Sequence, residues 1–205
     1  MFFRIKNFFL FCFFCITSGC ILVSFYIFIT YPKLPDVRSL DAYRPSTPLQ
    51  IFDRNGNLIT KIGVEKRIYI SEKETPPLLV NAIISAEDEN FFNHFGIDFL
   101  GIIRATIANI SSGSIVQGAS TITQQVARNF FLSNKKSFMR KINEILLAIK
   151  IDKTLEKSKI MNLYINQIYL GQRSFGFASA SETYFGKKLN DLNLAEIAML
   201  AGLPK

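Results

Sequence analysis

A long apolar run near the N-terminus is the feature that most limits what this chain can fold into. The 22 residues from Phe8 to Ile29 carry no charge, and about 20 apolar residues suffice for a helix to cross a bilayer. Arg4 and Lys6 precede the run and favour a cytoplasmic N-terminus, although cations soon after it weaken this bias. The sequence therefore predicts a cytoplasmic tail over residues 1–7 and a transmembrane signal-anchor helix over residues 8–30.

The run is longer than the apolar core of a cleaved signal peptide, which spans about 7–15 residues. All three cysteines of the chain, Cys12, Cys15 and Cys20, lie inside it. Their position in an apolar run argues against a redox pair or a zinc site as the meaning of their spacing. The rest of the chain has no cysteine, so its stability must come from a packed core.

The chain after the apolar run divides into a linker and one domain. Residues 31–48 contain four prolines and scattered charges, which is typical of an extended linker. Residues 49–205 suffice for one domain of ordinary size. Without Arg4 and Lys6 the chain carries a formal charge of +6. Beside a membrane anchor, this charge favours anionic lipid or a lipid pyrophosphate over nucleic acid as a partner.

A small β element is expected at the start of the domain. Apolar runs over residues 49–52 and 58–62 flank the pair Asn55–Gly56, and Asn-Gly between apolar runs favours a hairpin. Residues 67–70 fit a third short strand.

The rest of the domain is expected to be helical, so the predicted fold class is mainly α. Apolar residues at three- and four-residue spacing predict helices over residues 77–92, 98–112, 120–131, 137–152, 155–170, 177–185 and 193–203. Thr154 fits the N-cap of one helix, and Asn193 with Glu196 fits a capping box.

Three consecutive carboxylates, Glu87, Asp88 and Glu89, follow an apolar helix at a place where the helix dipole disfavours anions. A solvated helix end is one interpretation. The other depends on Phe91 and Phe92 close by, because a carboxyl packed against aromatic rings can acquire the raised pKa of a general base. Both interpretations stay open from these residues alone.

Glu144 is a second candidate carboxylate, and it follows Arg140 and Lys141 on a predicted helix. A surface ion pair with Arg140 would explain it. Two carboxylates from separate helices that meet at a cleft are, however, the usual equipment for chemistry at an anomeric carbon.

The segment Gly118–Thr121 presents backbone N–H groups and hydroxyls at a predicted helix start, which suits an anion or a sugar. Simple N-capping by Ser120 explains it equally well. Gln124, Gln125 and Arg128 follow on successive turns and offer amides for a sugar and a guanidinium for a phosphate.

Five motifs occur in a fixed order over about residues 48–205. They are Glu-Asp-x-x-Phe-x-x-His-x-Gly (Glu87–Gly96), Gly-x-Ser-Thr-Ile-Thr-Gln-Gln (Gly118–Gln125), Arg-Lys-x-x-Glu (Arg140–Glu144), Ile160–Gly171 and Ala180–Lys187. In this order the chain resembles family 51 peptidoglycan glycosyltransferases, which occur as the N-terminal domain of class A penicillin-binding proteins and as monofunctional enzymes.

The resemblance implies a lysozyme-like helical fold and polymerisation of lipid II into β-1,4 glycan strands, with release of undecaprenyl pyrophosphate. It implies that Glu87 is the catalytic base and that Glu144 is the second catalytic carboxylate, whereas His94 is structural. The implied substrate-binding residues are Asp88, Gly118, Ser120, Thr121, Thr123, Gln124, Gln125, Arg128, Lys136, Arg140, Lys141 and Asn166.

The resemblance also implies the setting of this reaction. The partners would be lipid II, the growing glycan strand, the bacterial inner membrane, and a transpeptidase or proteins of cell-wall elongation and division, with no nucleic acid. The catalytic domain of this single-pass protein would lie on the periplasmic side. No protein metal site is expected, and Mg²⁺ or Mn²⁺ at the donor pyrophosphate is the one candidate cofactor.

The chain departs from the family pattern in three ways. Arg128 and Lys136 are exchanged in type, and Lys159 stands where an acidic residue is common. The family continues through further helices after the position of Lys205, so we expect an incomplete C-terminus. Two alternatives are therefore kept: a lytic enzyme that acts on finished peptidoglycan, and a truncated, non-catalytic fragment that binds lipid II or serves as a scaffold.

Two short apolar segments have two interpretations as well. Phe99–Leu100 and Asn129–Leu132 would either contact the bilayer beside the lipid tail or belong to the core, and we favour membrane contact for part of them.

Overall fold

A computed structural model describes the chain as two compact units. The described residues are 2–45, 49–63, 65–114, 116, 118–133, 135 and 137–204. The first unit ends at Pro35, and the second begins at Asp36.

The first unit is one long helix, α1 (Phe2–Thr30), followed by a 3₁₀ turn over Tyr31–Lys33. Pro32 lies in this turn, where its ring cannot continue an α-helix. Within α1, Thr17 Oγ1 donates to the carbonyl of Phe14 at 3.0 Å, so this hydroxyl is satisfied inside the helix. Among the described residues, one helix is long and apolar enough to cross a membrane, judged by length and composition.

The second unit is mainly helical, which confirms the predicted fold class, and it carries two small sheets among its described residues. Its helices are α2 (Pro77–Glu87), α3 (Phe99–Ser112), α4 (Ile122–Phe131), α5 (Phe138–Thr154), α6 (Lys157–Gln167), α7 (Phe177–Phe185) and α8 (Leu194–Ala201). Its strands are β1 (Leu49–Phe52), β2 (Leu58–Ile62), β3 (Lys66–Arg67) and β4 (Ser174–Phe175).

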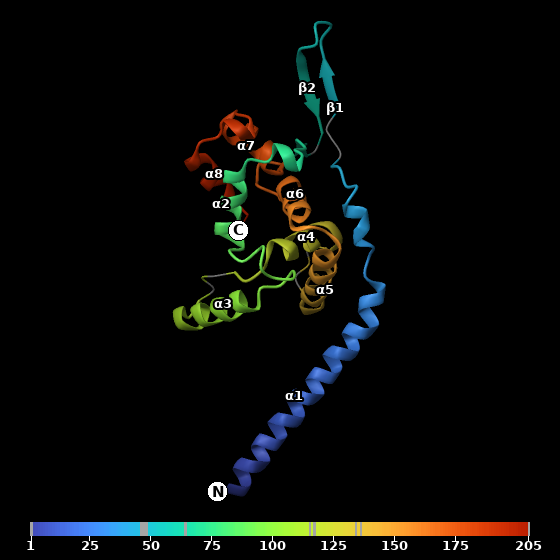
Figure 1. Cartoon of the computed structure of the whole chain (residues 1–205), viewed down its shortest axis with the longest axis vertical. Coiled ribbons are helices and arrows are strands. Elements are labelled where there is room, and N and C mark those ends of the chain that lie inside the picture. Colours follow the sequence, from blue (N-terminus) through green and yellow to red (C-terminus); the bar gives the residue numbers. More distant parts are fainter. Residues whose placement is uncertain are drawn as a thin grey trace. The chain divides into compact units, whose positions relative to one another are not determined.

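Helix α4 is the centre of the core and packs against both α5 and α6 (Figure 1). Ile122 and Val126, one turn apart on α4, are buried together with Ala127. Leu147 of α5 and Ile160 of α6 are buried as well. Each large apolar side chain removed from water in this way contributes about 1.5–3 kcal/mol, so the position of α4 is fixed from two sides.

The hairpin of β1 and β2 forms where the sequence predicts it, and Leu49 pairs with Ile62. The third strand is not where it was predicted. β3 comprises Lys66–Arg67 and pairs with β4 in a parallel arrangement. The backbone of Ile70 is unavailable to a strand, because its N–H and C=O bond the side chain of Asn166 at 3.0 and 2.9 Å.

Several helix ends also differ from the prediction. α2 ends at Glu87, since Asp88 leaves the helical conformation with φ −160°. Thr154 is the last residue of α5 and donates to the carbonyl of Lys150, so its prediction as an N-cap is wrong. The capping box of Asn193 and Glu196 at the start of α8 is confirmed.

Gly96 lies where the loop after α2 packs closely against α5. Its φ is +85°, and a Cβ built there would lie 2.6 Å from the carbonyl oxygen of Ala148. We expect Gly96→Ala to lower the free energy of unfolding by about 3 kcal/mol or more, from backbone strain and overpacking together. Gly113, with φ +65° and nothing within 4 Å, is the matched control, and its alanine variant should lose about 1 kcal/mol. Denaturant unfolding of the full chain in detergent measures both, and equal losses would contradict the close packing.

Candidate functional site

A cavity of about 960 Å³ opens at the C-terminal end of α2. The residues that line it are Ser85, Ala86, Glu87, Asp88, Glu89, Asp98, Gly101, Arg104, Val116, Gly118, Ala119, Ser120, Thr121, Gln125, Arg128 and Pro204. Seven of the predicted site residues are among them, although they come from two distant segments of the sequence. A second cavity of about 410 Å³ lies beside β3 and α7 and contains none of the predicted site residues.

Glu87 is the last residue of α2, and its carboxylate is held by a residue of α4. Gln125 Nε2 donates to Glu87 Oε2 at 2.7 Å, and such a bond favours the charged form of a carboxylate. Arg128 follows Gln125 by one turn and lines the same cavity. The site thus combines a candidate base and a cation on the wall of one cavity.

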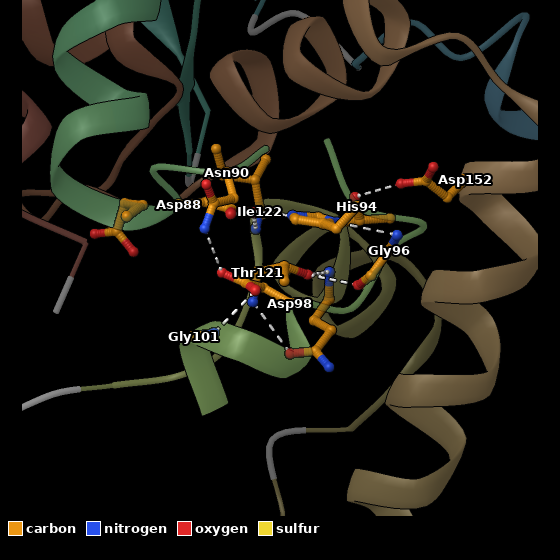
Figure 2. Close-up of polar contacts among 12 residues, drawn as sticks. Asp88, Asn90, His94, Gly96, Asp98, Gly101, Thr121, Ile122 and Asp152 are labelled. Carbon is orange, nitrogen blue, oxygen red and sulfur yellow. Dashed lines mark hydrogen bonds and ion pairs between the residues drawn. The ribbon is translucent and has the colours of Figure 1, made fainter. Parts of the chain in front are cut away.

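Asp88 also lines the cavity but is buried, and its carboxylate joins α2 to α4 (Figure 2). Both of its carboxylate oxygens lie 3.0 Å from His94 Nε2, and Oδ2 also accepts the backbone N–H of Ile122 at 3.0 Å. Gly96 N–H donates to His94 Nδ1, so Nδ1 has no proton and Nε2 is the donor to Asp88. Because this carboxylate sits at the N-terminus of α4, the helix dipole favours it.

The first turn of α4 is capped by Thr121, whereas Ser120 accepts a hydrogen bond from Lys141 of α5. Thr121 Oγ1 accepts the N–H of Gln124, and Gln124 Oε1 accepts the N–H of Thr121, both at 3.1 Å. Thr121 Oγ1 also donates to the carbonyl of Gly96 at 2.7 Å. The amide of Gln124 is therefore used by the cap and is buried.

Glu144 lies in a buried ionic group on α5, so its interpretation as a surface ion pair is wrong. Its side chain is 1% exposed, and Arg140 Nη1 lies 2.9 Å from its Oε2. Lys141 Nζ bonds Glu144 Oε1 and also donates to Ser120 Oγ at 3.0 Å. A buried carboxylate is stable only with such partners. The group does not line the cavity itself but reaches its wall through Ser120.

Three other predicted substrate-binding residues face the interior. Thr123 Oγ1 donates to Asp152 at 3.1 Å, Gln124 caps α4, and Asn166 bonds the backbone of Ile70. None of the three lines the cavity. Lys136, the remaining predicted residue, lies outside the described residues.

Asp98 and Arg104 line the cavity although sequence analysis did not select them. Burial acts to raise the pKa of Asp98, but the backbone N–H of Gly101 and the amide of Asn90 outweigh it, so its pKa is lowered. Asp98 is the N-cap of α3, a role that an Asp directly before an apolar helix signals. Arg104 pairs with Glu89 at 3.0 Å.

The acidic side chains at the cavity do not fit a protein-held metal ion. Among the described residues, no group of three or more His, Cys, Asp or Glu side chains is placed to hold one. Asp88 and Asp98 already accept hydrogen bonds from the protein.

Comparison with known proteins decides the family. A protein-family model described as a transglycosylase matches residues 55–205. The chain belongs to this transglycosylase family. Penicillin-binding protein 1A of Neisseria gonorrhoeae is 53% identical to this transglycosylase over 198 residues, 97% of this chain and 24% of that protein. The namesake of Vibrio cholerae is 47% identical over 201 residues, 98% of this chain and 24% of that protein.

The transglycosylase spans about a quarter of the length of these curated relatives. A crystal structure of penicillin-binding protein 1A from Haemophilus influenzae matches 79% of this chain and 14% of that chain, with 25% identity and a TM-score of 0.38. The resemblance found in the five motifs is confirmed at the level of the family.

The buried bonds of Asp88 should dominate the stability of this region. We expect Asp88→Asn to lower the free energy of unfolding by about 2–4 kcal/mol, because an amide cannot accept from both His94 and Ile122 as the carboxylate does. Glu89→Gln is the control, since this neighbouring carboxylate is 70% exposed in its pair with Arg104 and should give no measurable change. Denaturant unfolding compares the two, and equal stabilities would refute the structural role of Asp88.

Proposed function

We propose that this transglycosylase polymerises lipid II into β-1,4 glycan strands of peptidoglycan, with Glu87 as the general base. The observation that carries the proposal is the position of Glu87 on the wall of the large cavity, where Gln125 holds it. The family and the name of its penicillin-binding relatives support peptidoglycan as the product. In this scheme the protein acts in bacterial cell-wall synthesis.

The chemistry that we assign to Glu87 is proton removal from the 4-hydroxyl of the acceptor sugar. As the oxygen loses this proton, it forms a bond to the anomeric carbon of the donor, and the bond between this carbon and the pyrophosphate breaks. The electron pair of that bond leaves with undecaprenyl pyrophosphate. Attack on the face opposite the leaving group inverts the anomeric configuration. The position of Glu87 at the C-terminus of α2 disfavours its anion, which makes the carboxylate a better base.

The leaving pyrophosphate needs positive charge on the other side of the donor. Arg128 lines the cavity, and Lys141 reaches its wall through Ser120. Arg140 and Lys141 together bring two cations to the single carboxylate of Glu144, so this group keeps a positive formal charge. We assign the pyrophosphate to these cations and to Arg128, and Glu144 serves to position them.

One face of α3 suits contact with the bilayer from which a lipid-linked substrate would come. Its exposed apolar residues are Phe99, Leu100, Ile103, Ile107 and Ile110. They recur at the spacing of one helix face, while Gly101 and Arg104 of the same helix line the cavity. An apolar face of this kind is typical of a helix that lies in the membrane interface. We therefore place the second unit at the periplasmic surface of the inner membrane, anchored by α1.

Replacing the base tests the proposed reaction. We expect Glu87→Gln to slow the polymerisation of labelled lipid II by about 10²-fold or more, the usual contribution of a general base. Lipid II binding should persist, since the amide keeps the size of the side chain. The measurement is glycan chain formation by the full chain in detergent.

Glu72→Gln, at an exposed residue outside the cavity, is the control and should polymerise normally. Unchanged turnover in Glu87→Gln would exclude Glu87 as the base. Binding of lipid II without turnover by the unaltered chain would favour the scaffold alternative, and release of fragments from finished peptidoglycan without lipid II would favour the lytic one.

The apolar face of α3 can be tested with a fluorescent reporter, because the chain has no tryptophan. We expect Leu100→Trp, in full chain reconstituted into vesicles, to show blue-shifted emission that lipids brominated on their acyl chains quench. Leu194→Trp is the matched control, since Leu194 is also exposed but lies on α8, well apart from α3 (Figure 1). Equal quenching of the two reporters, or none at position 100, would contradict contact between α3 and the bilayer.

A further inference from the structure

Two buried polar atoms on the packed helices α4 and α6 have no hydrogen-bond partner among the described residues. Gln125 Oε1 is an acceptor without a donor among the described residues, and the hydroxyl of Tyr164 is a polar group without any partner there. Leaving one such group unsatisfied costs about 1–3 kcal/mol. Gln125 is also the residue that bonds Glu87, so one of the two atoms belongs to a side chain in direct contact with the candidate base.

Tyr164 lies in the core on α6, where it is 1% exposed. Helix α6 packs against α4, the helix that carries Gln125. Burial raises the pKa of Tyr164, the negative charge of Glu87 raises it further, and the positive charge of Arg128 acts against both. The hydroxyl therefore keeps its proton, and it lies within electrostatic reach of both charged residues.

We propose that Tyr164 is a positioning residue for Glu87, because its hydroxyl supplies the hydrogen that Gln125 Oε1 lacks and so fixes the amide with Nε2 toward the base. The inference rests on the proposed function. The Tyr164 hydroxyl would donate to Gln125 Oε1, either directly or through one water, and Gln125 Nε2 donates to Glu87 Oε2. Hydrogen bonds at active sites are often long without substrate and shorten in the reacting complex.

The orientation of an amide is the physical reason why a remote hydroxyl would matter. A carboxamide has an acceptor at one end and a donor at the other. With Nε2 toward Glu87, as in the structure, the amide oxygen remains available to accept the proposed hydrogen bond from Tyr164. With the amide flipped, its oxygen would face the carboxylate and repel it. Tyr164 gives the interior a donor, which fits only the first orientation.

Loss of the fixed amide should change how Glu87 titrates. A carboxylate that loses a hydrogen-bond donor holds its proton to higher pH. The other charged groups around the cavity, which are Asp88, Glu89, Asp98, Arg104 and Arg128, stay in place when the Tyr164 hydroxyl is removed.

The test is Tyr164→Phe in the full chain, which removes one oxygen and keeps the ring in the core. We expect kcat for lipid II polymerisation to fall about tenfold while KM stays within about twofold, as befits an interaction needed in the transition state. The acidic limb of the pH profile of kcat should move to higher pH. In a double-mutant cycle with Gln125→Ala, the two effects should not add, because both remove the same orientation of the amide.

Tyr184→Phe is the matched control. The hydroxyl of Tyr184, on α7, donates to the carbonyl of Leu170 at 2.7 Å, so its removal should lower the melting temperature without moving the acidic limb. The proposal is overturned if Tyr164→Phe keeps the kcat and pH profile of the unaltered chain, if only KM changes, or if the double-mutant effects add.

A second measurement separates this inference from the proposed function. If the unaltered chain fails to polymerise lipid II, the proposed function fails, and the carboxyl ¹³C resonance of Glu87 becomes the readout. That resonance is identified as the one that Glu87→Gln removes. A shift of its titration to higher pH in Tyr164→Phe supports the positioning role, and an unchanged titration overturns it.

Discussion

The buried carboxylate of Asp88 is the interaction on which the site depends. It ends α2, accepts from His94 and holds the first N–H of α4, at Ile122. Through these bonds the C-terminus of one helix meets the N-terminus of another. The end of α2 disfavours the negative charge of the Asp88 carboxylate, and the start of α4 favours it. The second effect offsets the first. Glu87, the preceding residue, bonds Gln125 instead, so the two adjacent acids, which both line the cavity, have different partners.

The start of α4 shows how much of the motif Gly118–Gln125 serves the fold and how much serves the cavity. Thr121 and Gln124 form a closed cap, and Thr123 bonds Asp152 of α5. Only Gln125, one residue further along, has its amide turned to Glu87. The first turn of α4 thus holds this helix in the core through Thr121, Thr123 and Gln124, and the next residue holds the candidate base.

The sequence predicted the parts of the fold that local chemistry decides. The Asn55–Gly56 hairpin and the Asn193 capping box are correct because turn and cap preferences act within a few residues. The early end of α2 and the pairing of β3 with β4 were missed, since each depends on a partner distant in sequence. For the site, residue types at motif spacing located the cavity wall. They could not tell that Thr123, Gln124 and Asn166 point inward, because tertiary packing decides that.

The cations near the site differ in how much of their charge is already neutralised by carboxylates of the protein. This difference decides how much charge each has left for an anionic ligand. Arg104 is paired with Glu89, whereas Arg128 has no ion-pair partner among the described residues. Arg140 and Lys141 share one buried carboxylate, so part of their charge is left for a second anion. Under the proposed function, Arg128 would be the cation on the cavity wall that the leaving pyrophosphate contacts. The group around Glu144 reaches that wall only through Ser120, so a contact with Lys141 would require the bond between Lys141 and Ser120 to open or be shared.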